Sequence, residues 1–144
     1  MKQNLSAETS ITIKAAPARV WRAITSPASI KKYLMGTTVT TDWKEGSPIT
    51  YEGEYHGKAY KDKGIIKTFK PESVLRSTYW SSMSGKEDKP ENYNTVTYTL
   101  SDEDDRTLLT LTQDNIATEE EKQHALKNWE QVLQKLKEVV EQQE

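Results

Sequence analysis

The sequence predicts an α+β fold in which a curved, mostly antiparallel β-sheet of about seven strands wraps around a long C-terminal helix. Residues 118–143 carry apolar side chains at the three- and four-residue spacing of an amphipathic helix. Between residues 37 and 113, short runs instead alternate apolar and polar side chains, which indicates strands. A single amphipathic helix after a run of strands can bury its apolar stripe only against the sheet. Such an arrangement leaves room for a ligand cavity between helix and sheet.

The N-terminal part is expected to form one strand and two short helices. Residues 10–15 alternate as a strand does, and Pro17 suits the first position of a helix. Ser26 is expected to cap a second helix, which Gly36 would end in the left-handed conformation. The side chains predicted to face inward are Ile11 and Ile13 of the strand, Val20, Trp21 and Ile24 of the first helix, and Ile30, Tyr33 and Leu34 of the second.

Six further strands are expected, and their short connections favour antiparallel pairing. Their predicted ranges are 37–41, 49–55, 59–69, 74–80, 95–100 and 106–113, with a hairpin turn at 102–105. The face of strand 74–80 that points inward stays open. One face would carry Val74, Arg76, Thr78 and Trp80, and the other Leu75, Ser77 and Tyr79. The two sets are nearly equally suitable, and a shift of one residue exchanges them.

The C-terminal helix has a recognisable start. Thr118 and Glu121 fit a capping box, and Glu119 and Glu120 suit the positive end of the helix dipole. The apolar stripe is formed by Leu126, Trp129, Leu133, Leu136 and Val140.

Composition narrows the classes of function. A chain of 144 residues fits one domain, spanning residues 1–144, and is long enough to bury a core. A net charge of −2 argues against a nucleic-acid partner, since phosphate binding needs a basic surface. The absence of Cys excludes disulfides and thiolate metal sites. No signal-peptide segment and no run of roughly 18 apolar residues occurs, so we expect a cytoplasmic protein without a membrane span.

Several segments resemble the family homologous to the activator of the heat-shock-protein-90 ATPase, within the START-like (SRPBCC) superfamily. They are Ala-Pro-Ala-Arg-Val-Trp-Arg-Ala-Ile-Thr-Ser-Pro at 16–27, the acidic-to-Gly loop at 42–51, Pro-Glu-Ser-Val-Leu-Arg-Ser-Thr-Tyr-Trp at 71–80, the strands at 95–100 and 107–113, and Trp129. The resemblance covers roughly residues 9–140 and implies the helix-grip fold. Eukaryotic activators carry a separate N-terminal domain that contacts the chaperone, and this chain resembles their other domain alone. Relatives elsewhere in the superfamily bind lipids, hormones or polyketides.

No strong catalytic or metal-binding motif is present. His56 and His124 lie far apart without a ligand-type spacing, and the acidic run from Asp102 lacks the glycine and glutamate of a calcium loop. A nucleophile elbow and a glycine-rich phosphate loop are also absent. Glu52 and Glu54 share one strand face, but alternating charges on a strand are typical of a solvated face. We therefore expect no metal site, no cofactor and no catalytic residue.

The candidate ligand site is the space between sheet and helix. Aromatic side chains of this kind often belong to a filled hydrophobic core. The helix-grip resemblance makes a ligand cavity lined by them about as well supported as a filled core. Arg76 would meet an acidic ligand group or a carboxylate such as Glu52 if its face points inward. The candidate ligand-binding residues are Met35 near the mouth, Tyr51, Tyr55, Arg76, Trp80, Tyr98, Trp129 and Leu133.

Three hypotheses of function follow. The leading one is non-catalytic binding of a small hydrophobic or amphipathic ligand in the cavity. The second is a chaperone-associated or stress-response interaction module, with Trp43 and residues 81–92 as the candidate exposed patch. The third is an enzyme acting on a small hydrophobic substrate through Arg76, Glu52 or a Tyr. A monomer and a homodimer are both compatible with the sequence.

Overall fold

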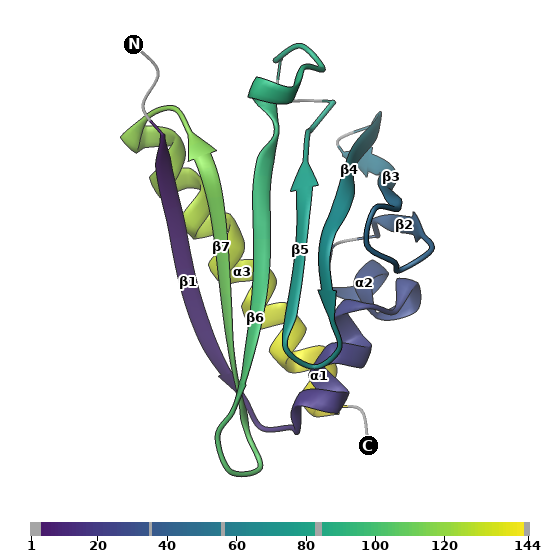
Figure 1. The fold of residues 1–144 in the computed structure, drawn as a ribbon, viewed down its shortest axis with the longest axis vertical. Helices are drawn as coiled ribbons and strands as arrows, with labels where there is room; N and C mark the ends of the chain where they lie inside the picture. Colours follow the sequence, from purple (N-terminus) through teal and green to yellow (C-terminus); the bar gives the residue numbers. More distant parts are fainter. Residues whose placement is uncertain (1–3, 35, 56, 83–84, 143–144) are drawn as a thin grey trace.

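A computed structural model shows seven strands and a long terminal helix, with two short helices after the first strand (Figure 1). It describes residues 4–34, 36–55, 57–82 and 85–142, with the backbone alone for Tyr55. The elements are β1 (Leu5–Ile13), α1 (Pro17–Ile24), α2 (Pro27–Tyr33), β2 (Thr38–Thr41), β3 (Pro48–Tyr55), β4 (Lys58–Lys70), β5 (Val74–Tyr79), the 3-10 turn η1 (Pro90–Asn92), β6 (Asn94–Asp102), β7 (Thr107–Ile116) and α3 (Glu119–Gln142). The α+β class and the order of elements are confirmed and fit the helix-grip fold.

The seven strands form one antiparallel sheet in the order β1-β7-β6-β5-β4-β3-β2. The first two strands of the chain therefore lie at opposite edges, and α1 and α2 connect them. Helix α3 lies diagonally across one face of the sheet (Figure 1). The predicted hairpin turn between β6 and β7 is confirmed. Asp104 and Asp105 both have positive φ, as the two central residues of a type I′ turn do. Across the hairpin, Glu103 N–H donates to Arg106 O at 2.9 Å.

The N-terminal elements follow the sequence with one difference. Pro17 and Pro27 begin α1 and α2. Gly36 is left-handed, with a φ of 90°. Ser26 occupies the cap position of α2, but its side chain makes no capping hydrogen bond, so that part of the prediction was wrong. All eight side chains predicted to face inward are buried or pack against the core.

Strand β4 changes direction beside Gly64, where a second strand comes unusually close. A Cβ atom at Gly64 would lie 1.7 Å from Thr78 O, so only glycine fits there. Two residues later, the pairing of β4 with β5 shifts register between Ile66 and Thr68. Such irregularities bend a strand and increase its twist.

Burial changes along α3. The helix begins as predicted, since Glu121 N–H donates to Thr118 Oγ1 at 3.1 Å. The reciprocal carboxylate bond goes to the Ala117 amide at 3.3 Å instead of to the cap residue itself. The buried residues of α3 are Leu133, Leu136, Val139 and Val140, whereas Leu126, Trp129 and Val132 are half-buried. The second half of α3 therefore closes the core, and the first half borders a space.

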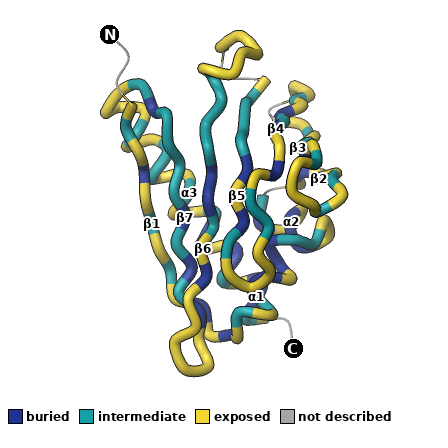
Figure 2. Tube along the Cα trace, in the orientation of Figure 1, coloured by how far each residue is buried: buried dark blue, intermediate teal, exposed yellow. Residues whose placement is uncertain are grey.

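Exposed residues concentrate in the connections (Figure 2). The β6–β7 hairpin and the long β5–β6 connection are exposed over most of their length. Trp43, a candidate for an exposed interaction patch, is half-buried. The centre of its ring lies 6.5 Å from the centre of the Phe69 ring. Among the described residues, the large hydrophobic side chain that is exposed is Ile65, at 41%. The predicted exposed patch at Trp43 was therefore wrong.

Candidate functional site

A cavity of about 1120 Å³ lies between the sheet, α2 and the first half of α3. Each element contributes the side chains that its periodicity turns inward. Its aliphatic wall consists of Ile24, Ile30, Leu34, Val39, Ile49, Leu75, Val96, Ala125 and Val132. A hollow of this size exceeds the usual volume of a pocket for a small organic molecule, about 300–1000 Å³.

Aromatic rings form a second part of the wall. They come from seven separate segments and are Tyr33, Trp43, Tyr51, Tyr60, Tyr79, Tyr98 and Trp129. The rings of Tyr51 and Tyr79 meet edge to face, with centres 5.6 Å apart and an interplanar angle of 73°. This is a preferred geometry for aromatic pairs, because the positive edge of one ring meets the negative face of the other.

Four of the phenols in this wall, those of Tyr33, Tyr51, Tyr79 and Tyr98, stay protonated at neutral pH. Burial raises the pKa of Tyr51 to about 12, and the negative charge of Asp62 acts in the same direction against a hydrogen bond with Ser77. Burial also raises the pKa of Tyr33, Tyr79 and Tyr98. These groups are neutral hydrogen-bonding groups and are not prepared as bases.

Two polar contacts fix aromatic side chains at the borders of the cavity. Tyr60 lies over Gly53, where a side chain would collide with the ring, and its hydroxyl lies 2.6 Å from Thr37 Oγ1. Trp129 Nε1 donates to Gln113 Oε1 at 2.7 Å and so joins α3 to β7. The cavity thus has ordered polar groups within an apolar lining, as ligand pockets commonly do.

Asp62 of β4 is the one charged side chain among the described residues that is buried, with 7% of its surface exposed. Its Oδ2 accepts a hydrogen bond from the Tyr79 hydroxyl at 2.5 Å. Its Oδ1 accepts from the Ser82 amide at 2.9 Å and from the Ser82 hydroxyl at 3.2 Å. The carboxylate also lines the cavity.

The remaining charged side chains of the lining come from the strand ends, a loop and the first turns of α3. They are Glu54, Lys86, Glu120, Glu121 and His124. Most of them are exposed, so they surround the mouth, whereas Asp62 lies inside. Acidic side chains outnumber basic ones among the described lining residues.

Three of the predicted site residues line this cavity, namely Tyr51, Tyr98 and Trp129. Their ability to bind a ligand stays a prediction. Leu133 is 1% exposed and belongs to the core beside the cavity instead of its lining. Met35 and the side chain of Tyr55 lie outside the described residues.

Arg76 lies on the outer face of the sheet, so the inward orientation considered for it was wrong. It is exposed, and its Nε donates to Thr97 Oγ1 on the neighbouring strand at 3.2 Å. Leu75, Ser77 and Tyr79 form the inner face of β5 and line the cavity. This phase follows from the pairing of β5 with β6, which sets Leu75 beside Tyr98 on the cavity side of the sheet.

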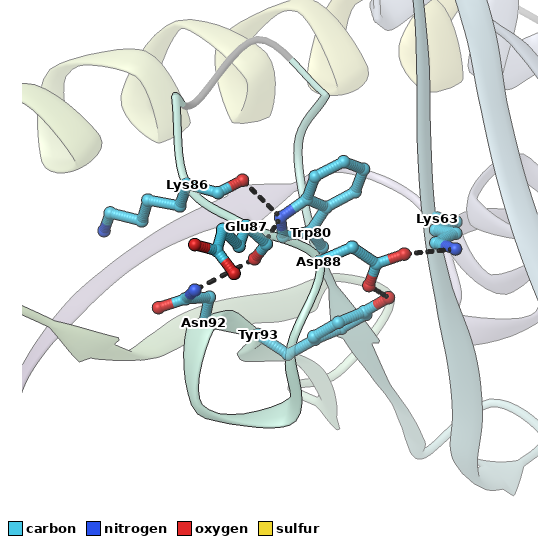
Figure 3. A network of polar contacts seen from close by, with 7 residues as sticks. All are labelled: Lys63, Trp80, Lys86, Glu87, Asp88, Asn92 and Tyr93. Carbon is cyan, nitrogen blue, oxygen red and sulfur yellow. Dashed lines mark hydrogen bonds and ion pairs between the residues drawn. The ribbon is translucent and has the colours of Figure 1, made fainter.

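Trp80 lies on the outer side as well and anchors the β5–β6 connection (Figure 3). Its Nε1 donates to Lys86 O at 3.2 Å and to Glu87 O at 3.1 Å. Lys63 Nζ lies 5.9 Å from the centre of the Trp80 ring and 2.5 Å from Asp88 Oδ2. Trp80 is not among the described residues that line the cavity.

The sequence interpretation missed Tyr33, Asp62 and Tyr79 as cavity residues. Asp62 was hidden in a strand whose many lysines suggested a solvated face. A signal was present, because Tyr60, Gly64 and Ile66 recur at spacing two and Asp62 falls in the same phase. A carboxylate in the apolar phase of a strand is unusual, because burying a charge is costly.

The described residues contain neither a metal-type cluster nor a membrane-type helix. No three His, Asp or Glu side chains converge in a group that could hold a metal ion. Within the same residues, no helix is both long and apolar enough to cross a membrane.

Comparisons place the chain among known proteins. A family model described as "Activator of Hsp90 ATPase homolog 1-like protein" matches residues 14–141. The solution structure of ChR145 from Cytophaga hutchinsonii is 44% identical to this chain, with a TM-score of 0.85, over 99% of this chain and 97% of that one. No curated protein matches the chain.

More distant structures share the fold. The Aha1 dimer from Colwellia psychrerythraea is 18% identical, with a TM-score of 0.75, over 94% of this chain and 96% of that one. CalU16 from Micromonospora echinospora is 21% identical, with a TM-score of 0.72, over 97% of this chain and 86% of that one. At these identities the likeness concerns the fold alone.

Proposed function

The chain belongs to the family of activator of Hsp90 ATPase homolog 1-like proteins, and on this premise we propose that it binds a small hydrophobic or amphipathic molecule without chemically changing it. Membership of this family suggests a ligand-binding or interaction module. The proposed ligand occupies the cavity between the sheet and the first half of α3.

The observation that carries this proposal is the lining of the cavity. Aliphatic and aromatic side chains from both helices and sheet converge on about 1120 Å³ without filling it. Trp129 and Val132 of α3 line this cavity and are only half-buried, although both are large apolar side chains. An apolar molecule in the cavity would cover these side chains and gain the free energy of removing apolar surface from water.

The electrostatics favour binding over acid–base catalysis by a tyrosine. A general base works best when its pKa lies near the working pH. The pKa of Tyr51 is about 12, and the pKa of Tyr79 is raised further by burial and by its hydrogen bond to Asp62. The Tyr51 phenol is therefore suited to donating a hydrogen bond to a ligand, whereas the Tyr79 hydroxyl already donates its proton to Asp62.

A fluorescence titration with N-phenylnaphthylamine, a neutral apolar probe, tests the proposal. Ala125→Phe places a ring in the cavity from α3, and Lys127→Phe places the same ring on the exposed side of the helix as a matched control. We expect the wild type and Lys127→Phe to bind the probe alike. Ala125→Phe should bind at least about tenfold more weakly, equivalent to about 1.4 kcal/mol.

Two results would contradict the proposal. In the first case, the wild type shows no saturable binding of the probe at all. In the second case, Ala125→Phe would bind as tightly as Lys127→Phe, which would place the probe somewhere else on the protein. Circular dichroism of both variants checks that they fold.

A further inference from the structure

The carboxylate of Asp62 carries a buried charge without a cationic partner. Among the described residues, no Lys, Arg or His forms an ion pair with it. Taking an ionised carboxylate out of water is costly, and proteins usually offset that cost with a counter-charge or with hydrogen bonds. Here only hydrogen bonds from Tyr79 and Ser82 are present.

These hydrogen bonds orient the carboxylate but leave acceptor capacity. An ionised carboxylate has about four lone-pair sites, two on each oxygen. Ser82 donates twice to Oδ1, whereas Tyr79 donates once to Oδ2. Oδ2 therefore keeps room for one more donor, and Asp62 lines the cavity.

The rings around Asp62 favour a positive charge as well. Tyr79 contacts the carboxylate directly, and Tyr51 lies beside Tyr79 with ring centres 5.6 Å apart. The faces of aromatic rings attract cations through their quadrupole, more strongly when water is excluded. Their hydroxyls stay neutral, so the two phenols neither repel a cationic ligand nor neutralise the charge of Asp62 in its place.

The charged side chains around the mouth of the cavity also favour a cationic ligand. Glu54, Glu120 and Glu121 line the cavity together with Asp62, against Lys86 and His124. With histidine neutral, the described lining carries four carboxylates and one ammonium group. A cleft lined mainly by one sign of charge raises the local concentration of the opposite ion.

We propose that the cavity selects cationic amphiphiles, with the ammonium-type head group beside Asp62 and the Tyr51–Tyr79 pair and the apolar body along the aliphatic wall. This inference rests on the proposed function, since it names the ligand class of the same cavity. Asp62 supplies the counter-charge, and the apolar lining supplies most of the contact area.

Three amphiphiles with the same ten-carbon chain separate charge from apolar contact. They are decyltrimethylammonium, decanol and decanoate, each titrated against bound N-phenylnaphthylamine. We expect decyltrimethylammonium to bind the wild type at least about tenfold more tightly than decanol, and decanoate to bind most weakly. Asp62→Asn should reduce the affinity for decyltrimethylammonium to that for decanol and leave decanol unchanged within about twofold.

Asp105→Asn is the matched control, because it removes the same charge in the exposed β6–β7 turn. Asn also tolerates the left-handed backbone there, where φ is 68°. This variant should keep the wild-type preference. If Asp62→Asn does not fold, the wild-type comparison still decides, because equal affinities for the cation and the alcohol overturn the inference.

The outcomes distinguish the two proposals. If the probe and decanol bind the wild type but the cation has no advantage, the selection of cations is refuted and the apolar binding site stands. If the preference for the cation survives in Asp62→Asn, the role of Asp62 is refuted. If neither the probe nor any amphiphile binds the wild type, both proposals fail.

Discussion

The hydroxyl of Tyr79 donates a hydrogen bond of 2.5 Å to Oδ2 of Asp62, the buried carboxylate of the neighbouring strand. A second phenol–carboxylate pair of the same length joins Tyr93 to Asp88 (Figure 3). Asp88 is exposed and also forms an ion pair with Lys63, whereas Asp62 is buried and lacks an ion pair among the described residues. They offer an internal comparison of a buried and an exposed hydrogen bond.

Tyr79→Phe is expected to lower the free energy of unfolding by about 1–3 kcal/mol, because it leaves the buried carboxylate with one donor fewer. Tyr93→Phe should cost less than about 1 kcal/mol, because water replaces the lost donor on exposed Asp88. Urea unfolding followed by circular dichroism measures both. Equal losses in the two variants would show that burial of Asp62 does not govern the strength of its hydrogen bond.

Alkaline pH is expected to destabilise the fold through the cavity phenols. Tyr51 has a pKa of about 12 in the folded protein, against a normal value of 10.0. Below about pH 10 the Tyr51 phenol keeps its proton in both the folded and the unfolded protein, so the free energy of unfolding keeps its full value. Between about pH 10 and 12 the unfolded chain alone releases it, which lowers the free energy of unfolding by about 2–3 kcal/mol.

Urea midpoints measured at a series of pH values test this dependence. Tyr51→Phe should be less stable at neutral pH, because it loses the hydrogen bond with Ser77, but its stability should fall less steeply above about pH 10. The phenols of Tyr33, Tyr79 and Tyr98 add to the loss in both proteins, since their pKa values are also raised. A variant that loses stability as steeply as the wild type would refute the assignment to Tyr51.

Thr107, at the start of β7, makes a buried hydrogen bond to the segment that follows β1. Its Oγ1 donates to Ala15 O at 2.7 Å, and the side chain is completely buried. Thr107→Val keeps the shape but leaves the carbonyl without this donor, so we expect a loss of about 1–3 kcal/mol in urea unfolding. Thr112→Val on the same strand is the control. Thr112 is half-buried without a side-chain hydrogen bond among the described residues, and its replacement should change stability by less than about 0.5 kcal/mol.

The two halves of α3 are expected to differ in their contribution to stability. Leu136 is 0% exposed, so Leu136→Ala should cost about 2–5 kcal/mol through lost burial and a residual cavity. Leu126 is half-buried, and Leu126→Ala should cost about half as much or less, because fewer contacts are lost. Thermal unfolding of the two variants provides the comparison. Similar losses would mean that the first half of α3 packs as tightly as the second.

Much of the fold could be predicted from the sequence because its local signals agree with one another. The capping of α3 by Thr118, the turn at Asp104 and Asp105 and the prolines that begin α1 and α2 are short-range features. Each depends on a few neighbouring residues, and the structure reproduces each one. The inward residues of the first strand and of the two short helices follow from the same local periodicity.

The candidate site could be predicted only in part, because its geometry depends on register and not on local pattern. The faces of β5 are alike in composition, and only pairing with β4 and β6 turns Tyr79 inward and Arg76 outward. The buried carboxylate of Asp62 accepts hydrogen bonds from the Tyr79 hydroxyl and the Ser82 amide, which lie 17 and 20 residues further along the chain. A single strand pattern holds no information about such partners.

The uneven burial of α3 has a consequence for how proteins of this kind can diversify. Its second half holds the core, while residues such as Glu120, Ala125 and Asn128 border the cavity without being buried. Substitutions at these positions change the shape and charge of the cavity with little loss of stability, and proteins have only a small reserve of stability. A duplicated gene could therefore acquire a new ligand through α3 before any compensating change elsewhere in the chain.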